Sequence, residues 1–156
     1  MSAFAVRLAT TEDVDQIHAI FLEQFPFLEV VSDKAREQAR QRVLRSDSRT
    51  VVACDDTGVA AVARGYELDG VYLMNSICTA KRLSLGERLE SMMKLLPQYA
   101  SIALEHAREL SLERAFYSTR VPSVVAIGRA LCKDLDLFFE EGEHAGEQGF
   151  WIRRHE

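Results

Sequence analysis

Apolar and polar residues follow the regular spacings of strands and helices along most of the chain. Phe4, Val6 and Leu8 alternate with small or polar residues, which predicts a short strand near the N-terminus. Residues 10–13 then supply hydroxyl and carboxylate groups that suit a helix N-cap, and apolar residues at helical spacing follow them. We therefore expect a first helix that Pro26 ends.

The next part of the chain predicts a second helix and then a run of strands. The helix spans about 32–45 and is rich in lysine and arginine, which form either a solvated face or a basic lip for an anionic ligand. Segments 49–54 and 59–66 are apolar and are joined by a turn at 55–58, so they predict a hairpin. Segment 71–78 predicts a third strand of the same meander.

A helical region with its own capping signal follows these strands. Ser84 and Glu87 have the spacing of a capping box, in which each side chain accepts from the other residue's backbone N–H. Four apolar residues recur on one face of the helix that begins there: Leu85, Leu89, Met92 and Leu96. Because proline is tolerated at the first position of a helix, Pro97 predicts a break between an extra helix at about 84–96 and a second helix that starts at the proline. A single kinked helix over 85–111 is the alternative.

The last third of the chain predicts a strand, a helix and two closing strands. Segment 115–119 is short and apolar, as in a buried strand. Pro122 opens a helix that carries apolar residues at helical spacing. Segments 135–139 and 149–152 predict the two closing strands, and an acidic, glycine-containing loop over 140–148 joins them.

The composition is that of one globular domain over residues 1–156. The chain is 47% hydrophobic and 28% charged, with a formal net charge of −5. That charge argues against a general nucleic-acid binder, which needs clustered positive charge. No apolar run is long enough to span a bilayer and no secretion signal is visible, so we expect a cytoplasmic protein that does not bind membranes. The cysteines and histidines have no metal-ligand spacing, so we expect no metal site.

The order of these elements, with three stretches of sequence, resembles the GNAT superfamily of N-acetyltransferases. Residues 7–13 resemble the family's opening strand and first cap, and residues 103–119 resemble its third helix running into its fifth strand. Residues 121–137 resemble its fourth helix and sixth strand, with Ala126 and Ile127 in the place of a recurring Ala-Ile pair. The resemblance implies an α/β (α+β) fold, in which a mixed, twisted sheet of six or seven strands is flanked by four or five helices.

The same resemblance places a cofactor cleft between two strands. Strands 71–78 and 115–119 are expected to be parallel neighbours that diverge at their C-terminal ends. Main-chain groups of Ile77, Cys78 and Thr79 would then meet the pantetheine arm of acyl-CoA. Relatives also draw the donors for the developing oxyanion from backbone amides of this fourth strand.

Relatives bind the pyrophosphate of coenzyme A through the motif Gln/Arg-x-x-Gly-x-Gly/Ala at the start of the third helix. This motif is eroded here: one placement lies on 95–100, where only Ala100 fits it. The cofactor contacts that this placement predicts are Gln98, Tyr99, Ala100 and Ser101. The other placement lies on 82–87 and requires a third helix about twice the usual length. Ser123 aligns with an asparagine that often precedes the Ala-Ile pair, and it is either a cofactor contact or only an N-cap.

Acyl transfer needs an acid to protonate the leaving thiolate and a base for the acceptor amine. The tyrosine that serves as the acid in many relatives matches Ala130 here, so Tyr117 and Tyr99 are the remaining donors. Glu67 and Asp69 are the carboxylates nearest to the fourth strand. We predict Tyr117 and Glu67 as the catalytic residues. The alternatives are a packed core tyrosine and an ordinary turn charge.

The resemblance implies an acyl-CoA-dependent N-acyltransferase. Its cosubstrate would be acetyl-CoA or another acyl-CoA, and its acceptor the amine of a small molecule or a peptide. The alternative is a GNAT-fold protein without catalytic activity that serves in binding or assembly, and fold alone does not choose between the two. The position of segment 80–96 would distinguish these two functions. If it fills the cleft, the protein is non-catalytic, and if it packs outward, it forms a homodimer contact and leaves the cleft open.

Overall fold

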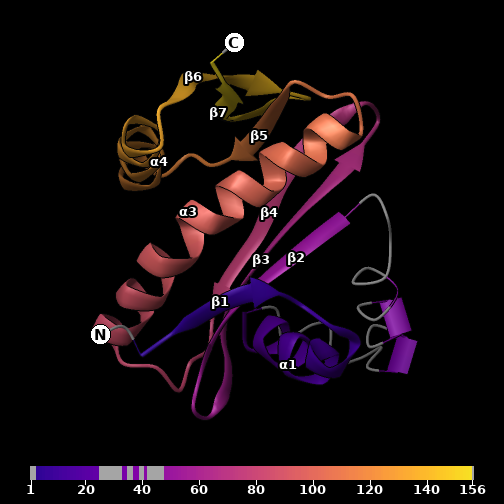
Figure 1. The fold of residues 1–156 in the computed structure, drawn as a ribbon, viewed down its shortest axis with the longest axis vertical. Coiled ribbons are helices and arrows are strands. Elements are labelled where there is room, and N and C mark those ends of the chain that lie inside the picture. The colour runs from indigo at the N-terminus through magenta and orange to yellow at the C-terminus, as the bar shows by residue number, and fades with distance from the viewer. Residues whose placement is uncertain (1–2, 25–32, 35–36, 39–40, 42–47, 156) are drawn as a thin grey trace.

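The computed structural model describes residues 3–24, 33–34, 37–38, 41 and 48–155 (Figure 1). Its elements in chain order are β1 (Ala5–Leu8), η1 (Thr11–Asp13), α1 (Val14–Gln24), β2 (Ser48–Asp55), β3 (Gly58–Leu68), β4 (Val71–Thr79), α3 (Leu85–Glu109), β5 (Arg114–Ser118), α4 (Pro122–Asp134), β6 (Leu137–His144) and β7 (Glu147–Arg154). The predicted end of the first helix at Pro26 and most of the predicted helix at 32–45 lie outside the described residues. Within the described parts of the chain, none of the helices has both the length and the apolar character that crossing a membrane requires.

The seven described strands form one mixed sheet in the order β1-β2-β3-β4-β5-β7-β6. All neighbours run antiparallel except β4 and β5, which run parallel and are joined by the crossover helix α3. These features confirm the predicted fold class, the number of strands and the parallel pair. The described residues form three α-helices, fewer than the four or five expected, because the two helices predicted around Pro97 are one and the helix at 32–45 is described only in part.

The core lies on both faces of the central strands. Residues 50–53 of β2 and 59–63 of β3 are buried without interruption. Because successive side chains of a strand point to opposite faces, both faces of the sheet must be covered there. Helices α1 and α3 both contact β3, and Figure 1 shows α3 crossing the sheet diagonally.

Helix α3 is continuous, so the predicted break at Pro97 is wrong. Its start is as predicted: the Ser84 Oγ accepts from the Glu87 N–H at 3.2 Å, and the Glu87 carboxylate accepts from the Ser84 N–H at 2.9 Å. A proline inside a helix removes a backbone hydrogen bond and costs ~3 kcal/mol or more. Packing offsets that cost, because α3 lies against five strands and buries Leu95 and Tyr99 on either side of the proline.

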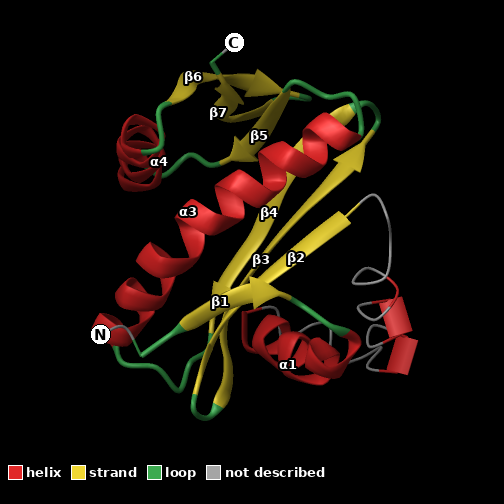
Figure 2. Cartoon of the chain, viewed as in Figure 1, coloured by secondary structure: helices red, strands yellow, loops and turns green. Residues whose placement is uncertain are grey.

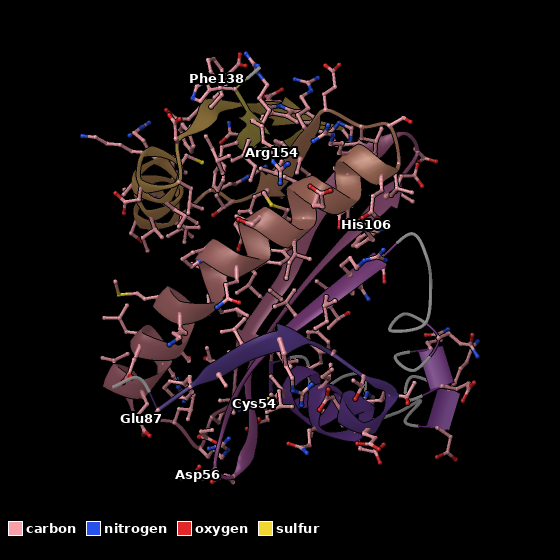
Figure 3. All side chains as sticks on the ribbon, viewed as in Figure 1. Cys54, Asp56, Glu87, His106, Phe138 and Arg154 are labelled. Carbon is pink, nitrogen blue, oxygen red and sulfur yellow. The ribbon has the colours of Figure 1, made fainter. Side chains whose placement is uncertain are left out.

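A buried polar pair fixes α3 to β4. The Tyr72 hydroxyl lies 2.9 Å from His106 Nδ1, and both residues are almost fully buried. Figure 3 labels His106. Gly65 on β3 leaves room for the Tyr72 ring, since a Cβ at that position would lie 2.7 Å from Tyr72 Cε1. The face of β4 that carries Tyr72 is therefore the face toward α3.

A bulge in β4 changes which of its later side chains share that face. Val62 of β3 pairs with Cys78 of β4, and the next pair is Arg64 with Asn75. Between these two pairs, β4 therefore has one more residue than β3. Because side chains alternate along a regular strand, the extra residue puts Ile77 on the same face as Tyr72. Cys78 consequently lies on the opposite face, where it is buried in the core.

Strands β4 and β5 stop pairing before either strand ends. Among the described residues, the positions that pair between the two strands are Tyr72–Ala115 and Leu73–Phe116. Beyond these positions β4 continues to Thr79, and β5, which pairs with β7 along its whole length, continues to Ser118. The two strands therefore have main-chain groups at their C-terminal ends that do not pair with each other.

The C-terminal strands are longer than predicted, and the loop expected over 140–148 is wrong. Most of that segment belongs to a hairpin, whose turn is made by Ala145 (φ 52°) and Gly146 (φ 80°). Two successive positive φ angles are typical of a tight two-residue hairpin turn. The acidic residues that indicated a loop lie along β6, an edge strand of the sheet, where charged side chains protect the unpaired edge.

Candidate functional site

Helix α4 lies to one side of α3 (Figure 2). A largely apolar cavity of about 300 Å³ lies between these two helices, where β4 and β5 stop pairing. Its walls come from both helices and its floor from β4, β5 and β7. The lining residues are Met74, Ile77, Met92, Leu96, Tyr99, Ala100, Tyr117, Val124, Ile127, Gly128, Leu131, Cys132, Phe150 and Ile152. The N-terminal half of α3 therefore does not fill the space beside the diverging strands.

This cavity collects four of the residues predicted from the sequence. Ile77 reaches it because of the bulge in β4, Tyr117 comes from β5, and Tyr99 and Ala100 come from α3. A polar groove of about 690 Å³ between α4 and the β6–β7 hairpin is larger, but none of the predicted residues lines it. We therefore take the apolar cavity as the candidate site.

The polar groups of the cavity are proton donors at neutral pH. Burial raises the pKa of Tyr117, and it raises the pKa of Cys132 to about 11. Burial also holds the pKa of Tyr99 well above its ordinary value, and the Tyr99 hydroxyl donates to the Arg64 carbonyl at 2.8 Å. Tyr99 thus fixes α3 to β3, whereas the Tyr117 and Cys132 side chains make no such bond to another residue that the structure describes.

No basic group lines the cavity among the described residues. The lining contains no carboxylate, imidazole or ammonium group. Glu67, the predicted base, lies instead in the β3–β4 turn, where its carboxylate accepts from the Gly70 N–H at 2.7 Å. That turn is at the end of β4 that pairs with β5, and Asp69 is exposed in the same turn. The role of Glu67 as the base stays a prediction that the cavity does not support.

The two placements of the pyrophosphate motif lie at different positions in α3, one in the middle of the helix and one at its first turn. The placement on 95–100 requires a helix start, but these residues lie in the middle of α3, so the structure does not offer that helix start. Their backbone N–H groups face the preceding turn of the helix rather than a ligand. Tyr99 and Ala100 contribute side chains to the cavity, and Gln98 and Ser101 are exposed.

The placement on 82–87 is at the first turn of α3, but its polar groups are engaged. The Arg82 guanidinium donates to the Asp55 carboxylate at 2.7 and 2.9 Å. The Glu87 carboxylate, at the start of the helix in Figure 3, accepts from the Ser84 N–H. A helix N-terminus attracts anions, and here a carboxylate of the chain itself is already there.

The remaining predicted residues lie outside the cavity lining. Thr79 ends β4, and Cys78 is buried on the other face of the sheet, where burial raises its pKa to about 11. Ser123 is exposed in the first turn of α4, and the N-cap position is Val121 rather than Ser123. The position matched to the family tyrosine, Ala130, is exposed and does not line the cavity.

Sequence reasoning missed the contribution of α4 and β7. Cys132 and Gly128 face the cavity from α4, and Phe150 faces it from β7. Gly128 allows close packing of helix on strand, because a Cβ there would lie 2.5 Å from Phe150 Cζ. The apolar spacing on α4 was visible in the sequence, but it predicts only a buried face and not a cavity.

Possible metal ligands do not gather in the described parts of the chain, since no three His, Cys, Asp or Glu side chains there are placed to hold an ion.

No protein-family model and no curated protein matches the sequence.

Solved structures share the fold at low sequence identity. A chimera of the spermidine N-acetyltransferase SpeG from Vibrio cholerae and hSSAT matches with a TM-score of 0.62 and 15% identity, over 97% of this chain and 96% of that one. An acetyltransferase of the GNAT family from Staphylococcus aureus matches with a TM-score of 0.60 and 13% identity, over 97% and 98%. The PaiA N-acetyltransferase from Thermoplasma acidophilum, in complex with coenzyme A, matches with a TM-score of 0.59 and 10% identity, over 97% and 99%. The fold is that of the GNAT acetyltransferases.

Proposed function

We propose that this protein transfers an acyl group from acyl-CoA to an amine and that the cavity between α3 and α4 holds the pantetheine arm. The observation that carries the proposal is the end of β4–β5 pairing beside this cavity. Main-chain amide and carbonyl groups that do not pair across the two strands can bond the amides of the arm. The complex of the structurally similar PaiA enzyme with coenzyme A supports this choice of cosubstrate.

The residues of the cavity fit the arm better than the start of α3 fits the pyrophosphate. Apolar walls such as Met92, Leu96 and Ile127 suit the methylene groups and methyl groups of the arm. At the start of α3, Glu87 opposes an anion, and Arg82 is held by Asp55. We therefore expect coenzyme A to bind with micromolar rather than tighter affinity, and to bind more weakly as salt concentration rises.

The chemistry is direct transfer, in which the N–C bond of the new amide forms and the C–S bond of the thioester breaks. The leaving thiolate takes a proton, and the Tyr117 hydroxyl and the Cys132 thiol are the donors that line the cavity. None of the described residues that line the cavity can take the proton of the acceptor amine, so the amine reacts as the free base and releases its proton to water. The rate is expected to rise with pH as the acceptor loses its proton.

Turnover assays test this function directly. Acetyl-CoA is incubated with spermidine or with a peptide that has a free N-terminus, and release of the coenzyme A thiol and the mass of the acceptor are followed. Acetylation of either acceptor that depends on the protein supports the proposal. Acetyl-CoA should also raise the melting temperature, since a ligand at 100 times its dissociation constant stabilises by ~2.7 kcal/mol. Absence of both effects overturns it.

A binding protein without catalytic activity is the second candidate. It is favoured by the Glu87 carboxylate at the start of α3 and by the lack of a base in the cavity lining. This candidate predicts no acetylation of any acceptor even where coenzyme A binds, so the turnover and melting experiments together separate the two.

A further inference from the structure

Two arginines face each other across neighbouring strands of the sheet. Arg114 of β5 pairs directly with Arg153 of β7, so the two side chains lie side by side on one face. Like charges at directly opposite positions of an antiparallel pair destabilise a sheet. None of the carboxylates that the structure describes forms an ion pair with either arginine. Within the described chain, this pair of positive charges is therefore not neutralised.

Aromatic rings orient both guanidinium groups. The Cζ atom of Arg114 lies 3.7 Å from the centroid of the Trp151 ring, and that of Arg153 lies 4.1 Å from the centroid of the Phe138 ring. A guanidinium group that stacks on an aromatic ring is held by its flat face, and its N–H groups remain at the edge. Those N–H groups match the spacing of two oxygens of an anion. Both arginines are thus held in place to donate to an anion.

The arginine pair lines two adjoining hollows. Arg114 and Arg153 both line a hollow of about 270 Å³. Arg153 also lines a hollow of about 570 Å³, to which Arg108 and Arg154 contribute. The described lining of the two hollows therefore contains four arginines and a single carboxylate, that of Glu113. This local excess of positive charge lies in a chain whose formal net charge is −5.

We propose that these hollows bind a phosphate group between Arg114 and Arg153. A phosphate dianion neutralises both arginines and offers an oxygen edge to each, whereas a single carboxylate has half the charge and two oxygens. Arg108 is exposed and can add a third contact, while Arg154 is already paired with Glu105 at 3.1 Å. Glu113 is exposed and opposes an anion, so it limits the affinity.

The phosphate site is separate from the apolar cavity. None of the described residues that line the two hollows also lines the cavity. Arg114 lies at the start of β5, and its side chain points to the opposite face of the sheet from Tyr117, three residues further along the strand. The larger hollow is lined in part by Leu104 and Leu112, so it can take an organic group attached to the phosphate.

Calorimetric titration with inorganic phosphate and with phenyl phosphate tests the proposal. Both are titrated at about pH 8, where a phosphate monoester is a dianion, and sodium chloride keeps the ionic strength constant. The wild type should bind with a dissociation constant on the order of 1 mM, because two charge-assisted contacts hold the phosphate. Tighter binding of phenyl phosphate assigns the site to a phosphate ester, and tighter binding of inorganic phosphate assigns it to the free ion.

Three variants with opposite expected effects test the residues. Arg153→Gln should weaken binding roughly tenfold or more, and Glu113→Gln should strengthen it because the opposing carboxylate is lost. Arg120→Gln is the matched control, since Arg120 is an exposed arginine that lines the polar groove beside α4. It changes the net charge as Arg153→Gln does and should leave binding unchanged. Circular dichroism and thermal melting check that each variant is folded.

Ile127→Glu shows whether the phosphate binds at the arginine pair or in the cavity. Ile127 lines the cavity, so this variant should bind both probes as the wild type does. Absence of saturable binding of both probes to the wild type, equal affinity of Arg153→Gln and Arg120→Gln, or loss of binding in Ile127→Glu overturns the proposal.

Discussion

Replacing Gly128 with alanine is expected to push the Phe150 ring into the cavity. The added Cβ would lie 2.5 Å from Phe150 Cζ and 2.9 Å from Cε1. Non-bonded carbon atoms prefer separations of about 3.5–4.0 Å, so the ring must move by roughly 1 Å. Both residues line the cavity, so the movement narrows the space that the pantetheine arm would occupy.

The change in the free energy of unfolding caused by Gly128→Ala follows from two opposing contributions. Alanine is favoured over glycine inside a helix by about 0.8–1.0 kcal/mol. Overpacking of a well-filled site costs about 1–3 kcal/mol. Gly128→Ala should therefore range from neutral to about 2 kcal/mol destabilising. Gly86→Ala is the matched control, because nothing lies within 4 Å of its added Cβ and only the favourable term remains.

Urea unfolding and calorimetric titration of coenzyme A measure the two consequences. Gly86→Ala should stabilise the protein by up to about 1 kcal/mol, which raises the melting temperature by ~2–4 °C in a chain of this size. It should leave coenzyme A affinity unchanged, whereas Gly128→Ala should lower that affinity. Equal stabilisation by both substitutions, with equal affinity for coenzyme A, would refute the packing argument.

Glu87→Gln should raise coenzyme A affinity several-fold, because it removes a negative charge from the first turn of α3 while an amide oxygen still accepts in the cap. Calorimetry at low and high salt checks this, and an unchanged affinity would mean that the pyrophosphate binds elsewhere. Tyr117→Phe and Cys132→Ala should each lower kcat by no more than roughly 10²–10⁴-fold, since two donors line the cavity. Complete inactivation of either folded variant in steady-state assays would identify a single indispensable acid. Asp13→Asn should destabilise the protein at neutral pH, because the hydrogen-bonded Arg7 guanidinium lowers the pKa of Asp13. A lowered pKa stabilises the folded state above the unfolded value of about 3.9, and that stability is lost as pH falls through the folded value. The difference from wild type in urea unfolding should therefore shrink below about pH 4, and a constant difference would contradict the ion-pair argument.

Local patterns predicted most of the fold because each element has its own signal. Three of these signals lie at or within one residue of the start of an element. They are the alternation at Phe4–Leu8 for β1, the cap at Ser84 for α3 and Pro122 for α4. The parallel pairing of β4 and β5 followed from the helical crossover between them. Both errors arose where tertiary packing outweighed a local signal. The predicted break at Pro97 is absent because packing against the sheet keeps α3 helical there. The predicted loop after Phe139 is instead a strand because this acidic segment pairs with β7.

The candidate site was less predictable, because a cavity is made by residues that are distant in sequence. Ile77 and Cys78 are neighbours and were predicted together, but the bulge in β4 sends them to opposite faces. Cys132 and Phe150 carry no motif and meet only once α4 packs on β7. Glu67 is close to the fourth strand in sequence, but its carboxylate accepts a hydrogen bond within its own turn and does not line the cavity.

Titration of coenzyme A into the wild-type protein and two glutamate variants tests most directly whether the cavity is an acyl-CoA site. Ile127 lines the cavity and Leu68 does not, and the two side chains are 51% and 50% exposed. Wild type and Leu68→Glu should bind one coenzyme A per chain with micromolar affinity, and Ile127→Glu should bind roughly tenfold more weakly or worse, a loss of about 1.4 kcal/mol. No detectable binding to the wild type at millimolar coenzyme A, or equal affinity of the two variants, would contradict the assignment.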